Sequence, residues 1–300
     1  MPPLLEATDL TKRYGSTLAL DSVNFTVESG ITGLLGPNGA GKSTAMKLFL
    51  GLLIPTSGSA TVMGEKPYEN VMARTHLGYM PEHECLPLPL TATEFLAHMA
   101  QISGLPTGAA RSRTADILRH VGLDEERYRS MGEYSTGMKQ RVKLAQALVH
   151  DPEMVFLDEP TAGLDPVGRE EMLALIRRTG KEFGISIMLS THLMGDVETT
   201  CDRIIVLEGG EVTAAGDVSG FTAESETVYI DVYDDVQSLI ATLSARGLEA
   251  SVDGVSVAVE GVGDSEYDQI RDALVEAGSR LRRLGPRRRR LSDIFRDGSE

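Results

Sequence analysis

The chain has only two cysteines and no long apolar run, and each of these shortages excludes a class of protein. Cys85 and Cys201 are far apart and show no metal-ligand spacing, so neither a disulfide framework nor a zinc site is expected. The longest apolar stretch, residues 48–54, is far shorter than the roughly 20 residues of a membrane-spanning helix. The N-terminus lacks the basic start and apolar core of a signal peptide. We therefore expect a soluble intracellular protein with reduced thiols.

Lysine is also scarce, because it supplies only 7 of the 29 basic residues, and the net charge is −15. A general nucleic-acid-binding protein is usually basic, so DNA or RNA is not an expected partner. An acidic surface with little lysine suits a salt-adapted organism, since carboxylates stay hydrated when charges are strongly screened. A GC-rich genome, which favours arginine, explains the same composition. The apolar fraction of 41% indicates a globular chain, long enough for one large or two modest domains.

The first 53 residues show the pattern of strands followed by a loop and a helix. Alternating apolar residues predict half-buried strands at residues 4–10 and 23–27. A third apolar run, residues 31–35, leads directly into a glycine-rich loop, and residues 43–53 contain good helix formers. Strand, glycine loop and helix form the context that a phosphate-binding loop requires.

Residues of about 83–150 are mostly helical in pattern, with short turns between the helices. Apolar runs without alternation follow at residues 154–157 and 185–189, as in strands of a parallel sheet covered on both faces. Residues 204–207 and 211–215 are typical of a hairpin around Gly209 and Gly210.

The pattern changes after about residue 220. Strands are predicted at residues 228–232 and 255–259, and helices at residues 236–246 and 267–277, before a closing strand at 281–284. We interpret this part of the chain as strand-helix-strand-strand-helix-strand, which is the ferredoxin-like order. We therefore predict a first domain over residues 1–220 and a small α+β domain over residues 221–300.

The glycine-rich loop matches G-x-x-x-x-G-K-S, the pattern of a phosphate-binding loop. Glycines let backbone N–H groups approach phosphate oxygens, and the following helix N-terminus adds free donors. Lys42 is expected to bridge the β- and γ-phosphates during catalysis, and the Ser43 hydroxyl to hold Mg²⁺. The nucleotide-binding residues predicted here are Gly36-Pro37-Asn38-Gly39-Ala40-Gly41-Lys42-Ser43-Thr44.

Asp158 and Glu159 stand at the end of an apolar strand, where carboxylates are costly unless they serve a cation or a reaction. We expect Asp158 to hold Mg²⁺, directly or through water. Glu159, one residue later, can reach an attacking water as general base. The alternative is that the two residues cap a helix that begins near Pro160.

Between the loop and the acidic pair, Ser135-Thr136-Gly137-Met138-Lys139-Gln140 resembles the L-S-G-G-Q signature motif of ATP-binding cassette (ABC) ATPases. The resemblance covers about residues 4–220. It implies an α/β P-loop NTPase fold with a mixed core sheet, an N-terminal antiparallel β part and a helical subdomain. In this family the signature segment binds the γ-phosphate of ATP held by another copy, which assigns Ser135, Gly137 and Met138 to nucleotide binding. A Ser-Thr-Gly sequence is also an ordinary helix N-cap.

Three further positions match the family in order. Tyr14 resembles the aromatic residue that stacks on adenine, although a plain turn tyrosine would look the same. Asp165 closes Ala162-Gly163-Leu164-Asp165, which resembles the D-loop that crosses the dimer interface. His192 resembles the switch histidine that contacts the γ-phosphate and is expected to act in catalysis. A lone histidine is more often structural, but this one follows a predicted core strand, at the usual ligand edge of an α/β sheet.

Glu82 departs from the family pattern, which usually has glutamine at this position. Glutamate can still bind Mg²⁺ or orient water, with an added negative charge. Glu82 and the Met138 form of the signature resemble the daunorubicin-resistance-like, type-2 exporter branch. Residues 291–295, Leu-Ser-Asp-Ile-Phe, resemble the S-L-E-D-V-F ending of that branch.

The resemblance implies an ATP-binding and ATP-hydrolysing subunit that uses ATP and Mg²⁺. It implies a homodimer, or a heterodimer with another ABC ATPase, and a separately encoded permease that recruits the chain to the cytoplasmic face of the cell membrane. An importer subunit is the nearer alternative. A soluble cassette ATPase acting on ribosomes or DNA is the other, but this chain lacks the second cassette or coiled-coil insertion of such proteins.

Arginines at the C-terminal end form the densest basic patch of this acidic chain. Contact with anionic lipid headgroups is one interpretation. A solvated strand edge, or ion pairing with the acidic surface, is the other. The patch consists of Arg280, Arg282, Arg283 and residues 287–290.

Overall fold

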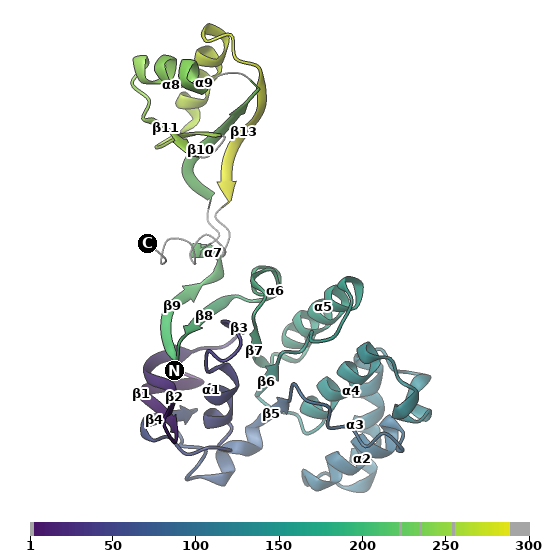
Figure 1. Cartoon of the computed structure of the whole chain (residues 1–300). Helices are drawn as coiled ribbons and strands as arrows, with labels where there is room; N and C mark the ends of the chain where they lie inside the picture. Colours follow the sequence, from purple (N-terminus) through teal and green to yellow (C-terminus); the bar gives the residue numbers. More distant parts are fainter. Residues whose placement is uncertain (1–2, 222–223, 234–235, 254–255, 289–300) are drawn as a thin grey trace. The chain divides into compact units, whose positions relative to one another are not determined.

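Two units, residues 1–218 and residues 219–300, make up the chain. The computed structural model in Figure 1 describes residues 3–221, 224–233, 236–253 and 256–288. Each unit has its own hydrophobic core, as domains do.

An antiparallel sheet of three strands begins the first unit. Its strands lie in the order β2-β1-β4, with β1 at Leu5–Tyr14, β2 at Thr17–Val27 and β4 at Ser57–Val62. In β2, buried Val23 and Phe25 alternate with exposed neighbours, because successive side chains of a strand point to opposite faces. The predicted antiparallel β part is therefore confirmed.

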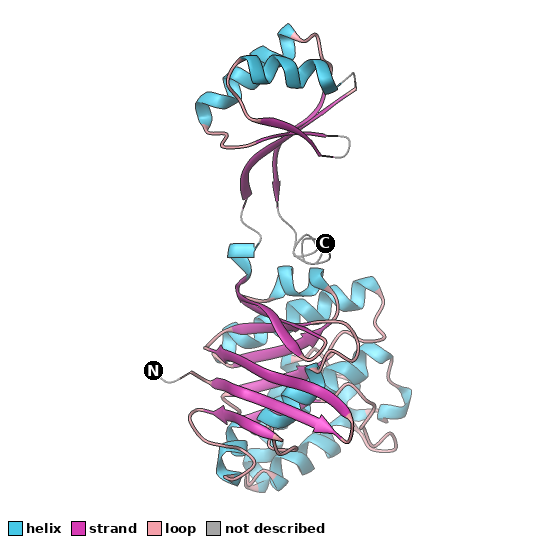
Figure 2. Cartoon of the chain, turned by 60° about the vertical axis from the view of Figure 1, so that its left-hand side comes forward, coloured by secondary structure: helices cyan, strands magenta, loops and turns pink. Residues whose placement is uncertain are grey.

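A sheet of six strands forms the centre of the first unit, in the order β5-β6-β7-β3-β8-β9. All neighbouring strands are parallel except β8 and β9, so the sheet is mixed, as predicted. Every residue of β3, β6 and β7 is buried, which explains their unbroken apolar runs. Figure 2 distinguishes the strands (magenta) from the helices (cyan) around them. The strands are β3 (Ile31–Leu35), β5 (Leu77–Met80), β6 (Met154–Asp158), β7 (Ser186–Thr191), β8 (Arg203–Glu208) and β9 (Glu211–Asp217).

The register of the central sheet brings its functional loops to one edge. Leu35 in β3 pairs with Thr191 in β7, and Asp158 in β6 pairs with Ser190. Because parallel strands point the same way, the loops that leave β3, β6 and β7 emerge side by side. This carboxyl edge is where open α/β sheets bind ligands.

Three helices follow strands of the central sheet: α1 (Lys42–Phe49), α5 (Pro166–Phe183) and α6 (Met194–Thr200). Helix α1 was predicted to continue to Leu53, and that boundary is wrong. Gly51 takes a positive φ of 65°, and a Cβ there would lie 2.4 Å from the carbonyl oxygen of Pro67. The chain therefore turns out of the helix at a residue that only glycine suits.

Three longer helices lie within residues 83–150: α2 (Ala92–Ile102), α3 (Thr107–His120) and α4 (Thr136–Leu148). Thr91 and Glu94 form a capping box at the start of α2. No helix in the described ranges has both the length and the apolar character needed to cross a bilayer. Short 3-10 turns complete the unit: η1 (Val71–His76), η2 (Glu126–Tyr128) and η3 (Met131–Glu133).

Helix α4 packs on strand β5 at Gly78. A Cβ at this position would lie 2.1 Å from the carbonyl oxygen of Ala147. We expect Gly78→Ala to lower the free energy of unfolding in urea by about 1–3 kcal/mol, the usual cost of overpacking. Gly285→Ala in the second unit is the control, because its added Cβ meets no atom within 4 Å. Equal stability of the two variants would contradict close packing of α4 on β5.

The second unit is an antiparallel four-stranded sheet covered by two helices. Its strand order is β11-β12-β10-β13, the arrangement of a ferredoxin-like fold, as predicted. Leu239 and Leu243 of α8 and Ile270 of α9 are buried in its core with residues of β10 and β12. The short α7 (Val218–Phe221) precedes the elements β10 (Glu224–Val232), α8 (Val236–Ala245), β11 (Ala250–Asp253), β12 (Ser256–Val259), α9 (Asp264–Glu276) and β13 (Leu281–Arg288).

The predicted basic patch is partly visible at the end of this unit. Arg282 and Arg283 are exposed on β13, and the guanidinium of Arg280 lies 5.9 Å from the centre of the Tyr233 ring. Residues 289–290 of the patch and the ending at residues 291–295 lie outside the described residues.

Candidate active site

The loop between β3 and α1 encloses the side chain of Lys42. Lys42 Nζ donates to the carbonyl oxygens of Gly36, at 2.7 Å, and Pro37, at 3.2 Å, and only 6% of the residue is exposed. A Cβ on Gly36 would lie 2.2 Å from the carbonyl oxygen of Leu207, so this backbone passes where no side chain fits. No side chain caps the N-terminus of α1, which begins at Lys42. Its first N–H groups are thus free to bind an anion such as phosphate.

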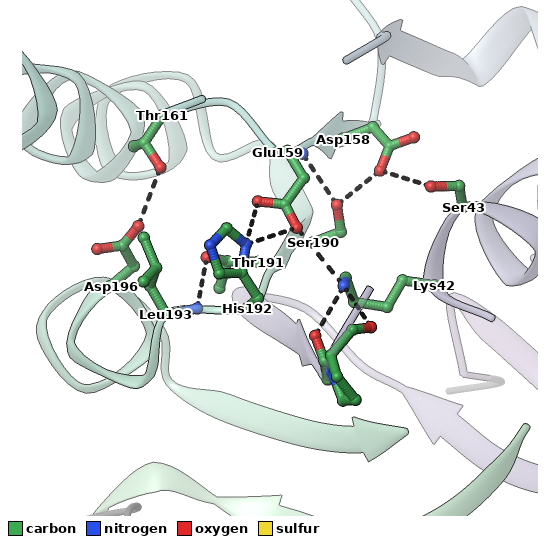
Figure 3. Close-up of polar contacts among 12 residues, drawn as sticks. Lys42, Ser43, Asp158, Glu159, Thr161, Ser190, Thr191, His192, Leu193 and Asp196 are labelled. Atoms are coloured by element: carbon green, nitrogen blue, oxygen red, sulfur yellow. Dashed lines mark hydrogen bonds and ion pairs between the residues drawn. The ribbon is translucent and has the colours of Figure 1, made fainter. Parts of the chain in front are cut away.

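The carboxylate of Asp158 accepts hydrogen bonds from two hydroxyl groups, one at the start of helix α1 and one near the end of strand β7 (Figure 3). Its Oδ1 accepts from Ser43 Oγ at 3.1 Å and from Ser190 Oγ at 2.7 Å, and the residue is only 3% exposed. Tyr79 in β5 approaches the other oxygen, with its OH 3.5 Å from Asp158 Oδ2. Burial, and next the Asp158 charge, raise the pKa of Tyr79, so its phenol stays a neutral donor.

Ser43 and Asp158 together fit a Mg²⁺ ion. Hydroxyl and carboxylate oxygens are the ligands that Mg²⁺ prefers. Among the described residues, no group of three or more His, Cys, Asp and Glu side chains is placed to hold a metal by itself. Mg²⁺ commonly takes one or two protein ligands and completes its shell with substrate phosphates and water. The two-ligand arrangement therefore suits a metal that arrives with a nucleotide.

Glu159 has a strained backbone, with φ at 48° in the left-handed region, although it is not glycine and precedes Pro160. Such a conformation costs about 1–3 kcal/mol and persists where the surroundings hold it. The Glu159 N–H donates to Ser190 Oγ at 2.9 Å, which anchors the turn. The carboxylate then points between Lys42 and His192 (Figure 3).

The Glu159 carboxylate is buried between a cation and an imidazole. Its Oε1 lies 3.5 Å from Lys42 Nζ, and its Oε2 lies 3.1 Å from His192 Nδ1. The alternative role of Asp158 and Glu159 as helix caps is wrong, because the next helix, α5, begins at Pro166 with Asp165 as its N-cap. An oriented, largely buried carboxylate of this kind can act as a general base.

Ser190 was not predicted from the sequence, although it stands at the carboxyl end of a buried apolar strand, as Asp158 does. We expect Ser190→Ala to lower the free energy of unfolding by about 1–3 kcal/mol, because the Glu159 N–H and Asp158 Oδ1 each lose a buried partner. Urea unfolding measures this. Ser186→Ala, at the other end of β7, is the control, and an equal loss there would contradict the bridging role.

Glu82 lies at the same edge of the sheet as Asp158. Met80 of β5 pairs with Leu157 of β6, and Glu82 follows two residues after Met80. Its carbonyl oxygen accepts from Lys143 Nζ of α4 at 2.8 Å, a contact that was not predicted from the sequence. Glu82 itself is exposed, and its carboxylate has no hydrogen bond or ion pair among the described residues. The residue is free to act as the predicted metal ligand.

Tyr14 ends the β1 strand at the hairpin to β2 and is 46% exposed. The hairpin lies against the phosphate loop, because a Cβ on Gly41 would come within 2.5 Å of the carbonyl oxygen of Ala19 in β2. Lys12 Nζ lies 5.3 Å from the centre of the Tyr14 ring. The ring is exposed, as the predicted contact with adenine requires.

The signature residues occupy a different place from the phosphate loop. A hollow of about 610 Å³ is lined by Ser135, Gly137, Met138 and Asp165, and no phosphate-loop residue lines it. Ser135 caps α4 by accepting from the Met138 N–H at 3.3 Å, so it is an N-cap as the alternative interpretation stated. Within one copy of the chain, the signature residues therefore do not line the same hollow as the phosphate loop around Lys42.

Asp196, also not predicted, links the loop after Glu159 to two helices. It is 1% exposed and accepts from Thr161 Oγ1 at 3.0 Å and from Arg169 Nε at 2.6 Å. Thr161 follows Glu159 by two residues, Arg169 lies in α5, and Asp196 lies in α6 after His192. This buried pairing ties the loops of the two strand ends together.

Comparisons with known proteins agree with this geometry. Residues 20–162 match the model of the ABC transporter family. An uncharacterised ABC transporter ATP-binding protein of Bacillus subtilis is 38% identical over 225 residues, which are 75% of this chain and 74% of the relative. The bacitracin transport ATP-binding protein of Bacillus licheniformis is 39% identical over 216 residues, 71% of this chain and 69% of the relative.

A solved structure shows the same fold. It is a dimeric ATP-binding cassette in a post-hydrolysis state, bound to ADP and Pi, with 26% identity and a TM-score of 0.65 over 72% of this chain and 100% of that chain. Together with the two bacterial relatives, it confirms the family predicted from the motifs. The chain belongs to the family of ABC transporter ATP-binding proteins.

Proposed function

We propose that this chain binds and hydrolyses ATP as a dimer and drives a separately encoded permease, most simply an exporter. The observation that carries the proposal is the buried Glu159 carboxylate between Lys42 and His192, one residue after Asp158. A protein that only bound nucleotide would have no use for a strained carboxylate at this place.

Lys42 and the free N–H groups of α1 hold the β- and γ-phosphates of ATP. Ser43, Asp158 and Glu82 are the residues that would hold Mg²⁺, which would neutralise phosphate charge. Glu159 accepts a proton from a water whose oxygen forms a bond to the γ-phosphorus. The bond from that phosphorus to the oxygen shared with the β-phosphate breaks, and ADP and phosphate leave. His192 keeps the Glu159 carboxylate in place.

The signature hollow supports a two-copy site, since Ser135 and Gly137 line a face without any phosphate-loop residue. Helix α4 begins at this face, and a helix N-terminus favours a phosphate. The structurally similar cassette bound to ADP and Pi is a dimer.

We expect the specific ATPase activity of the purified chain to rise with protein concentration. A specific activity independent of concentration across the range where the chain is monomeric would contradict the dimeric site.

Export is the proposed direction, on the cytoplasmic face of the membrane through the permease. Glu82 and Met138 match the exporter branch, and the Bacillus licheniformis relative is a bacitracin transport protein. An adjacent gene that encodes about six hydrophobic spans and no cassette supports this proposal. An adjacent gene for a solute-binding protein would instead favour the importer.

A further inference from the structure

Two of the seven lysines of the chain lie on one face of α4 and reach the segment after β5. Lys143 Nζ donates to the Glu82 carbonyl at 2.8 Å, and Lys139 Nζ pairs with Glu84 Oε1 at 2.9 Å. Residues four apart in a helix are neighbours on its surface, so both contacts come from the same face. In a chain with so little lysine, this face of α4 is a distinct concentration of positive charge.

Lys143 differs from Lys139 because it is buried, with only 4% of the residue exposed. A buried ammonium is costly unless negative groups surround it. Burial lowers the pKa of Lys143, while nearby carboxylates, Glu82 first among them, oppose that effect. Its 2.8 Å hydrogen bond to the Glu82 carbonyl oxygen places the ammonium beside the Glu82 backbone.

Glu82 creates an electrostatic problem at an ATP site. Together with Asp158 and Glu159 it makes three carboxylates at the edge where ATP is proposed to bind, and the Glu82 carboxylate has no hydrogen bond or ion pair among the described residues. Lys42, the cation of the phosphate loop, already faces Glu159 at 3.5 Å. Lys42 is therefore engaged elsewhere, and the cation held against the backbone of Glu82 is Lys143, whose Nζ lies 2.8 Å from the Glu82 carbonyl oxygen.

We propose that Lys143 is a positioning residue that holds the Glu82 backbone and offsets the negative charge of the Glu82 carboxylate, so that ATP is not repelled. The inference rests on the proposed function only in taking this edge as the ATP site. The two residues form one functional unit: a lysine is required at position 143 because a glutamate occupies position 82.

Binding of ATP to four full-length proteins tests the unit: the parental chain, Glu82→Gln, Lys143→Met and the double variant. Equilibrium dialysis in EDTA measures the Kd for ATP without any metal. We expect Lys143→Met to raise that Kd about tenfold in the parental background and less than about twofold beside Glu82→Gln, the coupling typical of residues in contact. An equal increase in both backgrounds would overturn the proposal, because it would show that Lys143 only anchors the backbone.

Further variants separate charge from packing. Lys181→Met is the control, because that lysine is exposed in the last turn of α5 and belongs to neither the phosphate loop nor the signature segment; its Kd should stay near the parental value. Lys143→Gln removes the charge but keeps a donor, and it replaces Lys143→Met if the latter does not fold by circular dichroism. Lys143→Arg keeps the charge and should retain binding. If the parental chain itself does not bind ATP, the proposed function fails, whereas normal parental binding without coupling overturns only the role of Lys143.

Discussion

Replacing Glu159 with glutamine is expected to lower ATP turnover by about 10²–10⁴-fold while ATP binding stays near the parental level. Glutamine has almost the same shape, so it fills the space between Lys42 and His192. It cannot accept the proton of the attacking water, however. Steady-state phosphate release measures turnover, and equilibrium dialysis measures binding.

Glu153→Gln is the control for this variant. Glu153 precedes strand β6 at the edge of the sheet opposite to Asp158, where it pairs with His76 at the surface. Its turnover should remain close to that of the parental chain. Parental turnover in Glu159→Gln would show that another group takes the proton, and loss of ATP binding would show that Glu159 serves structure instead.

Placing a glutamate at Gly137 is expected to reduce turnover about 100-fold, comparable to the loss of a charge-stabilising donor in other active sites. A Cβ fits at Gly137, since its nearest neighbour, Leu164 Cδ2, would be 3.8 Å away. A carboxylate in the first turn of α4 stabilises the helix but repels a phosphate presented to it. The variant should therefore fold and bind ATP, yet fail to hydrolyse it.

The chain offers a closely matched control at Gly108. Gly108 is the second residue of α3, as Gly137 is of α4, and a Cβ there meets no atom within 4 Å. Gly108→Glu therefore makes the same change to a helix N-terminus away from the signature hollow. Unchanged turnover in Gly108→Glu is expected. A similar loss in both variants would mean that the effect is on the helical region and not on the signature face.

Secondary-structure elements that are specified by a local residue pattern could be predicted from the sequence. The loop at Gly36, the strand that ends at Asp158 and the helices within residues 83–150 all follow from local patterns, and the structure contains them. The ferredoxin-like order of the second unit was also predicted, because Val228 and Ile230 in β10, and Val257 and Val259 in β12, stand at alternate positions; the strand β11 was not among the named elements. The end of α1 was missed, because the conformation of Gly51 depends on the distant Pro67.

The supporting contacts of the site were not predictable from sequence. Three of these hydrogen bonds join residues that are far apart in the sequence. The separation is 32 residues for Ser190 and Asp158 and 35 residues for Asp196 and Thr161. It is 61 residues for Lys143 and Glu82. Such pairs depend on strand register and helix packing, which no local pattern specifies. The positive φ of Glu159 is likewise a product of the tertiary structure, since both its side chain and Pro160 oppose it. The roles of Tyr14, His192 and Asp165 remain predictions.

The central claim is that each ATP is held by the phosphate loop of one copy and the signature segment of another. Mixing two inactive variants, Lys42→Ala and Gly137→Glu, tests it most directly. A dimer of either variant alone has a defect in both of its ATP sites. A mixed dimer contains one complete site, formed by the phosphate loop of the Gly137→Glu copy and the signature segment of the Lys42→Ala copy. An equimolar mixture is expected to recover roughly a quarter of parental turnover, because half of the dimers are mixed and each has one of two sites intact. A mixture as inactive as either variant alone would contradict a site shared between copies.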